Sequence, residues 1–93
     1  MKNKILFQCP CCDYYTLSER FWYIICPVCF WEDDWIDINN LDEISSPNNI
    51  TLREWRLNFT KYWACDINMK KNVIPIIERN KYKYIFRDIN NKN

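Results

Sequence analysis

Glycine and histidine are both absent from this chain of 93 residues. Every position that needs a left-handed backbone must therefore be filled by another residue, and Asn and Asp tolerate that conformation best. The twelve asparagines are accordingly the expected turn formers. Without histidine, the chain lacks the commonest general base and the commonest ligand of catalytic zinc. The absence of histidine therefore argues against an enzyme.

Long apolar runs are also missing. The first apolar run, Ile5-Leu6-Phe7, is too short for the core of a signal peptide. No stretch approaches the roughly 20 apolar residues that a membrane span needs. We therefore expect a cytoplasmic protein with no membrane contact. In a reducing compartment, closely spaced cysteine pairs usually bind a metal or carry out redox chemistry, and disulfides are rare.

The net charge of +1 indicates nothing about partners, but the charges are unevenly distributed. Residues 31–43 carry six acids and no base, whereas residues 67–93 carry seven bases and two acids. Hydrophobic residues make up 48% and aromatic residues 17% of the chain, which is enough for a folded core. We expect one domain over 1–93 that comprises a zinc ribbon (1–32), an acidic loop (33–50), a helix (51–64) and a basic C-terminal segment (65–93).

Four of the six cysteines form two pairs with the same spacing. Cys9-Pro10-Cys11-Cys12 and Cys26-Pro27-Val28-Cys29 each separate their outer cysteines by two residues, which lets two sulfurs face one ion. Two such pairs supply four thiolates, enough for tetrahedral zinc, and small domains commonly use a metal in this way. The predicted metal ligands are Cys9, Cys12, Cys26 and Cys29, around one structural Zn²⁺ in a site with no open position.

Two rival chemistries accompany this prediction. Iron also suits a site of four thiolates, so it stays open, although nothing nearby suggests electron transfer. A redox dithiol would need a helix after each cysteine pair, and the residues that follow look like strands. Of the other two cysteines, we expect Cys11 to point away from the cluster or donate weakly to it, although it could replace Cys9 or Cys12 as a ligand. We expect Cys65 to behave as a small buried hydrophobe, with a disulfide or ligand role as the alternative.

Short strands and one helix are predicted, which gives an α+β fold. Strands are expected at 5–8, 14–17 and 21–25, with a hairpin turn at 18–20. The helix at 51–64 begins with a capping box, Thr51 to Glu54, and repeats apolar residues on one face. That face comprises Leu52, Trp55, Phe59 and Tyr62, while Arg53, Arg56, Thr60 and Lys61 are expected mostly on the other faces. In the C-terminal segment, 81–86 alternates like a strand, although a helix over 76–89 is an alternative.

These motifs resemble those of the bacterial cysteine-rich CPCC family. The resemblance rests on 9–12, 15–17, 25–34, the Pro-Asn pair at 47–48, and the Ala-Cys-Asp step at 64–66 after the helix. It implies a zinc-ribbon-like fold and a bound metal, and it names no substrate. The family usually has glycine after the first cysteine pair, where this chain has Asp13, a residue that can adopt the same backbone at some cost.

An aromatic and acidic segment follows the second cysteine pair. It could dock a protein, because tryptophan dominates interface hot spots, or its acids could bind a divalent cation. The favoured interpretation is that Trp31 packs under the hairpin while the acids stay solvated and pair loosely with the basic tail. The candidate interaction residues are Trp31, Glu32, Asp33, Asp34 and Trp35.

The function predicted from the sequence is a non-catalytic zinc-binding module that acts through a protein partner. The alternative is a zinc ribbon that binds nucleic acid through its tail. There, basic residues alternate with Tyr82, Tyr84 and Phe86, a pattern that suits phosphate contacts and base stacking. The acidic loop would repel phosphate, and the whole chain is not basic, so a protein partner is favoured.

Overall fold

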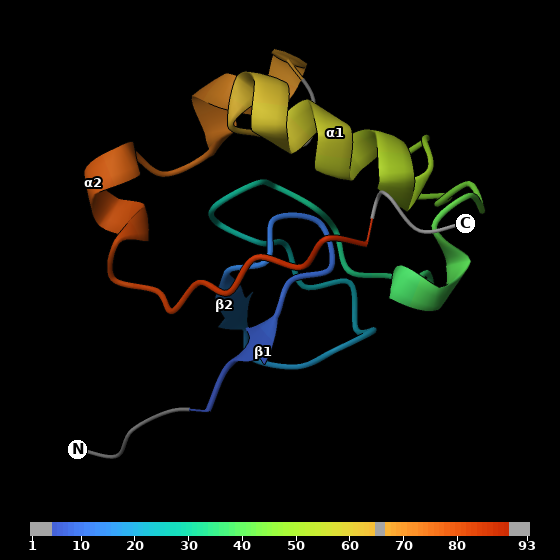
Figure 1. Ribbon diagram of the computed structural model, residues 1–93, viewed down its shortest axis with the longest axis horizontal. Helices are drawn as coiled ribbons and strands as arrows, with labels where there is room; N and C mark the ends of the chain where they lie inside the picture. Colours follow the sequence, from blue (N-terminus) through green and yellow to red (C-terminus); the bar gives the residue numbers. More distant parts are fainter. Residues whose placement is uncertain (1–4, 65–66, 90–93) are drawn as a thin grey trace.

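A computed structural model describes residues 5–64 and 67–89. Its elements, in chain order, are two short strands, a 3₁₀ turn, the main helix, a second 3₁₀ turn and a short helix (Figure 1). Their bounds are β1 Phe7–Gln8, β2 Tyr15–Leu17, η1 Ile38–Asn40, α1 Leu52–Tyr62, η2 Ile67–Asn72 and α2 Ile76–Arg79. The predicted α+β class is therefore confirmed. None of the helices in the described residues has the length and apolar character of a membrane span.

The chain forms two antiparallel hairpins, each closed by a cysteine pair. In the first, β1 pairs with β2 so that Phe7 lies opposite Leu17. In the second, residues 23–26 run against 31–33, with a bridge between Ile25 and Glu32. Segment 21–25 is thus not the partner of 14–17, and 18–20 is not a hairpin turn. That prediction was wrong because two residues of 21–25 take the left-handed backbone, which a regular strand excludes.

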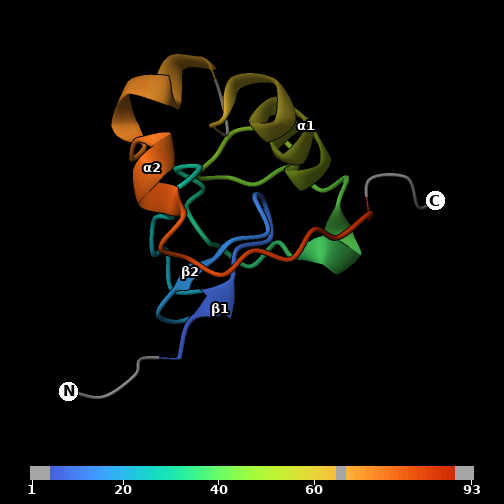
Figure 2. The ribbon, with the colours of Figure 1, turned by 60° about the vertical axis from the view of Figure 1, so that its left-hand side comes forward.

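The C-terminal segment is extended where it passes the first hairpin. The Tyr15 amide donates to the Lys83 carbonyl (2.8 Å), and Tyr14 bridges to Tyr84. Figures 1 and 2 show this part of the chain, in red, crossing beside β2. The strand predicted over 81–86 is therefore partly right, whereas the helix predicted as an alternative over 76–89 is limited to α2.

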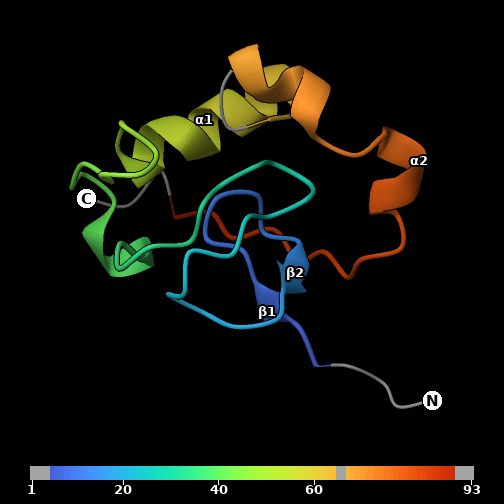
Figure 3. The ribbon, with the colours of Figure 1, turned by 180° about the vertical axis from the view of Figure 1, so that it is seen from behind.

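Helix α1 begins where its capping box predicts. The Thr51 side chain accepts a hydrogen bond from the Glu54 amide, and Leu52, Trp55 and Phe59 are buried. The helix lies along one side of the two hairpins in the front and back views (Figures 1 and 3). One expectation fails, since Arg56 is also buried because it reaches the first hairpin. Cys65 falls outside the described residues.

Candidate metal centre

The first cysteine pair closes a tight turn. The Cys9 amide donates to the Tyr14 carbonyl (2.8 Å), and the Asp13 amide donates back to the Cys9 carbonyl (3.1 Å). Asp13 has φ 71°, a left-handed conformation that glycine adopts most easily. This turn over residues 9–13, here called the first knuckle, is therefore complete. Aspartate stands in the position where the family resemblance led us to expect glycine.

The second cysteine pair repeats this arrangement over residues 26–30, here called the second knuckle. The Cys26 amide donates to the Trp31 carbonyl (2.9 Å), and the Phe30 amide donates to the Cys26 carbonyl (2.8 Å). Phe30 has φ 73°, nearly the same as Asp13. Two knuckles with the same backbone present four sulfurs from two directions.

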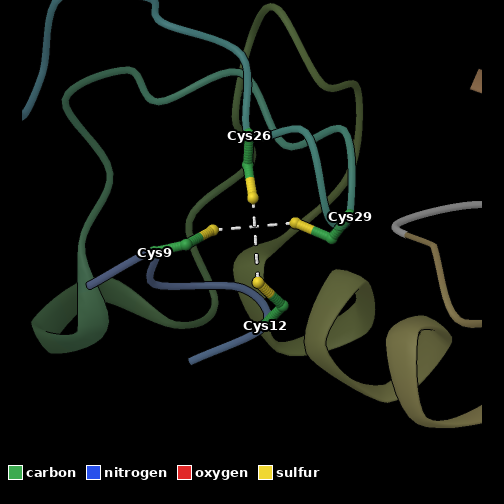
Figure 4. A group of neighbouring side chains, drawn as sticks. All are labelled: Cys9, Cys12, Cys26 and Cys29. Carbon is green, nitrogen blue, oxygen red and sulfur yellow. Dashed lines mark hydrogen bonds between the residues drawn. The ribbon is translucent and has the colours of Figure 1, made fainter. Parts of the chain in front are cut away.

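The four outer cysteines converge on one point. Their Sγ atoms all lie within 4.8 Å of one another, with Cys9 and Cys29 at 3.6 Å and Cys12 and Cys26 at 3.8 Å (Figure 4). Four sulfurs at about 2.3 Å from one tetrahedral ion would lie about 3.8 Å apart. The side chains are all buried. The residues therefore fit a metal ion held by four thiolates, as the spacing in the sequence predicts.

Burial and hydrogen bonding together set the pKa values of these four sulfurs. It raises the pKa of Cys9 to about 11 and the pKa values of Cys12 and Cys29 well above their ordinary range. Burial opposes charge on Cys26 as well, but hydrogen bonds from the neighbouring cysteines and Thr16 outweigh it and hold that pKa well below its usual range. Because burial opposes the thiolates, a cation among the sulfurs is what allows all four to ionise.

A buried ion cluster lies behind the first knuckle. Asp13 accepts hydrogen bonds from Arg56 (Nη1 to Oδ1, 2.8 Å) and from Arg87 (Nε to Oδ1, 2.8 Å). The same arginines donate to the carbonyls of Pro10 (2.7 Å) and Cys9 (2.9 Å). Two guanidinium groups around one carboxylate place positive charge beside a site whose four thiolates would exceed the charge of a dication.

Sequence reasoning missed this cluster because its members lie 43 and 74 residues apart from Asp13. It also missed Thr16, whose hydroxyl lies 3.0 Å from the Cys26 sulfur, and the Trp31 amide, which donates to the Cys29 sulfur at 3.4 Å. The one available signal was Asp13 itself, an acidic residue at the knuckle position where the family usually has glycine.

The other predictions for cysteine chemistry can be compared with the structure directly. Cys11 lies inside the first knuckle, but its sulfur donates to the Trp55 carbonyl at 3.4 Å and stands outside the group of four. Neither pair leads into a helix, since Cys12 is followed by β2 and Cys29 by the return strand of the second hairpin. The arrangement therefore lacks the helix N-terminus that activates a redox dithiol.

The aromatic and acidic segment divides into buried and exposed residues. Trp31 is fully buried against Trp55, as favoured, with ring centroids 5.2 Å apart. Asp33 and Asp34 are buried too, so the expectation of solvated acids is wrong for them. Glu32 is half-buried, and Trp35 is exposed. Trp35 is therefore the residue of this set that remains most available to a partner.

Two further hypotheses for the acids, the disfavoured cation site and the loose pairing with the basic tail, are not supported among the described residues. The cysteine cluster is the one metal-binding group found among the described residues, so Glu32, Asp33 and Asp34 do not assemble a cation site. The ion pairs between described residues do not join the acidic loop to the tail. Asp33 pairs with Arg20, whereas in the tail Arg87 pairs with Asp13 and Lys81 with Glu78.

Comparison with known protein families identifies the family of this chain. A family model described as Cysteine-rich CPCC matches residues 7–80. The chain belongs to the cysteine-rich CPCC family. No curated protein and no solved structure matches it. The CPCC match covers both knuckles, α1 and α2, and it ends before the extended segment that carries Arg87.

Proposed function

We propose that this CPCC protein is a non-catalytic, cytoplasmic module in which one zinc ion stabilises a surface for a protein partner. The observation that carries the proposal is the closed cluster of four buried sulfurs. Four protein ligands fill a tetrahedral ion completely, whereas catalytic zinc keeps one position for water or substrate. The lack of histidine in the sequence supports the same conclusion.

Zinc is favoured over iron on chemical grounds. Zinc has no redox chemistry and suits a site whose purpose is to join two parts of a small chain. Elemental analysis of the purified protein should find one zinc per chain. A protein with bound iron(III) would instead absorb visible light through its thiolate ligands, and one iron per chain would overturn the choice of metal while leaving the site intact.

A protein partner is supported by the exposed aromatic residues near the second knuckle. Trp22 and Trp35 are 69% and 70% exposed, and tryptophan is the residue most enriched in interface hot spots. Large exposed aromatic side chains also lower the solubility of a protein. A partner that covers them would explain why they are present.

The nucleic-acid alternative is weakened by the positions of the tail cations. Arg79 is buried, Arg87 is bonded to Asp13, and Lys81 pairs with Glu78. Lys83 lies over the Tyr15 ring, at 5.0 Å from its centroid. Phosphate binding through this segment would therefore have to compete with contacts that these side chains already make.

The proposed function is tested with the metal-loaded chain as bait in an extract of its host, followed by reconstitution with each candidate partner. A saturable complex that survives physiological salt and is lost in Cys26→Ser would support the proposal. Labelled DNA and RNA form the competing arm. Micromolar or tighter nucleic-acid binding at physiological salt, abolished by changing Lys81, Lys83 and Arg87 to Ala, would overturn it.

A further inference from the structure

The loop between the two knuckles holds aromatic side chains out in solvent. Within residues 19–25, here called the aromatic loop, Trp22 is 69% and Tyr23 49% exposed. Phe21 and Tyr23 have φ 67° and 63°, conformations that are rare for residues with bulky side chains. A backbone that is unfavourable at two aromatic residues persists only where other contacts impose it, and such residues gather at ligand-binding sites.

The contacts that impose this backbone come from one buried residue, Asp33. Its Oδ2 accepts from the Phe21 amide (2.8 Å) and from Arg20 Nε (2.8 Å), and its carbonyl accepts from the Tyr23 amide (2.9 Å). The Trp31 indole, packed in the core, donates to Oδ1 at 3.2 Å. The aromatic loop is thus fastened to the core, so its exposed rings are positioned before any partner arrives.

Trp35 extends the same surface from the other side. Its ring stacks on Phe21, with centroids 5.9 Å apart and an interplanar angle of 4°. The backbone beside it is fixed by Asp34, which accepts from the Ile36 amide (2.9 Å) and from the Ser45 hydroxyl (2.7 Å). Trp35 is nevertheless 70% exposed, so this anchored ring presents most of its surface to solvent.

The charge around these rings is negative. Residues 19–37 contain five acids and one base, Arg20, which is already paired with Asp33 and Asp37. Of these acids Glu19 is exposed, Glu32 and Asp37 are half-buried, and Asp33 and Asp34 are buried. Tryptophan faces attract cations, with the indole the best of the three aromatic rings for this interaction. Exposed rings in a segment of net negative charge, with Glu19 exposed and Glu32 half-buried, therefore complement a positively charged partner.

We propose that the aromatic loop and Trp35 bind a basic segment of a partner protein. Lysine or arginine side chains of that segment lie over Trp22 and Trp35, and the carboxylates of Glu19 and Glu32 attract and orient it. This inference rests on the proposed function, since it names the chemistry of the protein partner. The metal contributes indirectly, because the second knuckle holds Asp33 in the strand opposite the aromatic loop.

The test uses a deca-lysine peptide as the probe, titrated into the metal-loaded protein by calorimetry and followed by tryptophan fluorescence. The wild-type chain should bind it, more weakly as salt is added, and should not bind deca-glutamate. Trp22→Ala with Trp35→Ala should weaken binding by about tenfold or more. The matched control is Phe86→Ala, which removes a ring that is 60% exposed on the tail and should leave binding unchanged.

A second pair of variants separates local from overall charge. Glu19→Gln and Glu78→Gln change the net charge equally, but Glu19 belongs to the aromatic loop and Glu78 to α2. Only Glu19→Gln should weaken binding of deca-lysine. Metal content and circular dichroism confirm that every variant is folded. Equal effects of the two variants would mean general charge attraction and would overturn the inference.

Other occupants would give different results. Concentration-dependent self-association in the ultracentrifuge that Trp35→Ala removes would assign the surface to a second copy of the chain, and binding of a labelled oligonucleotide lost with Trp22 and Trp35 would assign it to nucleic acid. Either result overturns the inference. If a reconstituted partner binds the tryptophan double variant as tightly as wild type, the inference fails while the proposed function stands. Deca-lysine binding without any partner complex would remove the proposed function and, with it, the inference that rests on it.

Discussion

Asp13 has two roles that glycine could not combine. Its backbone is left-handed, which closes the first knuckle, and its buried carboxylate holds Arg56 and Arg87. The first role costs free energy for any residue with a side chain, about 1 kcal/mol. The second role more than offsets that cost, because the buried guanidinium of Arg56 and the half-buried one of Arg87 need a counterion. In this chain without glycine, the side chain at the left-handed position thus stabilises the fold through its ion pairs.

Asp13→Gly should therefore destabilise the protein, although glycine suits the backbone. We expect a loss of about 3–5 kcal/mol in the free energy of unfolding, since Arg56 would keep its buried charge, and Arg87 its half-buried one, without the carboxylate. Chemical denaturation of the metal-loaded protein measures it. The control is Asn49→Gly, at φ 70° on the exposed loop, which should be neutral or stabilising by about 0.5–1 kcal/mol. Equal effects at both positions would contradict a role for the carboxylate.

Metal affinity should fall steeply as the pH falls. Because burial raises the pKa of Cys9 to about 11 and those of Cys12 and Cys29 well above their usual range, these thiols carry protons at neutral pH unless a metal displaces them. Binding therefore releases protons, about three per metal, so lowering the pH opposes binding and raising it favours binding. Competition with a chromophoric chelator at a series of pH values measures the slope. An affinity that does not change between mildly acidic and mildly alkaline pH would exclude four-thiolate ligation.

At the scale of elements, local signals were predictable and distant ones were not. The capping box at Thr51 and the spacing of Leu52, Trp55 and Phe59 lie within a few residues, so helix α1 could be predicted closely. The cysteine spacing likewise predicted the four sulfurs. The second hairpin was mispredicted, because phenylalanine and tyrosine in left-handed conformations leave no compositional signal. Asp33 was read as a surface acid, since its partner Arg20 and the indole of Trp31 become its neighbours only in the fold.

Helix α2 is joined to α1 by a buried cation. The Arg79 guanidinium lies over the rings of Tyr14, Phe59 and Trp63, with its carbon 6.0, 5.4 and 5.3 Å from their centroids. It donates to the Trp63 carbonyl at the end of α1, where positive charge complements the helix dipole. Its Nε and Nη1 atoms have no hydrogen-bond partner among the residues that the structure describes. The contacts of Arg79 with the three rings and with the end of α1 thus offset part of the free-energy cost of burying its charge.

Arg79→Met should leave stability unchanged or raise it by about 1 kcal/mol, because methionine keeps the aromatic packing and removes a buried charge with unpaired donors. Arg79→Ala should lose about 2–4 kcal/mol, since it leaves a cavity among three rings. Thermal and chemical unfolding of both variants measure the difference. A methionine variant as unstable as the alanine variant would show that the charge itself is required at the end of α1.

The stability of the whole molecule depends on the sulfur cluster more than on the two-stranded sheet. The strands are two and three residues long, and five of the thirteen buried hydrophobic residues in the described part of the chain are cysteines. A core of this size gives little stability to a chain under about 100 residues. The knuckles, α1 and the extended tail all meet around the sulfur cluster. A metal there would therefore provide much of the folding free energy, on the order of 10 kcal/mol.

Removing the metal should unfold the protein as a whole. A strong chelator should abolish the near-ultraviolet circular dichroism of the buried tryptophans, and added zinc should restore it under reducing conditions. Cys26→Ser should give the same loss without a chelator, because three ligands leave a buried, incompletely coordinated ion. Cys11→Ser is the matched control, since Cys11 lies in the same knuckle but contacts the Trp55 carbonyl, and a serine hydroxyl can still donate there. If Cys11→Ser lost the metal while Cys26→Ser retained it, the ligand set would be wrong. If the chelated protein kept its tertiary signal, the short core would be sufficient by itself, and the metal would have to serve a purpose other than folding.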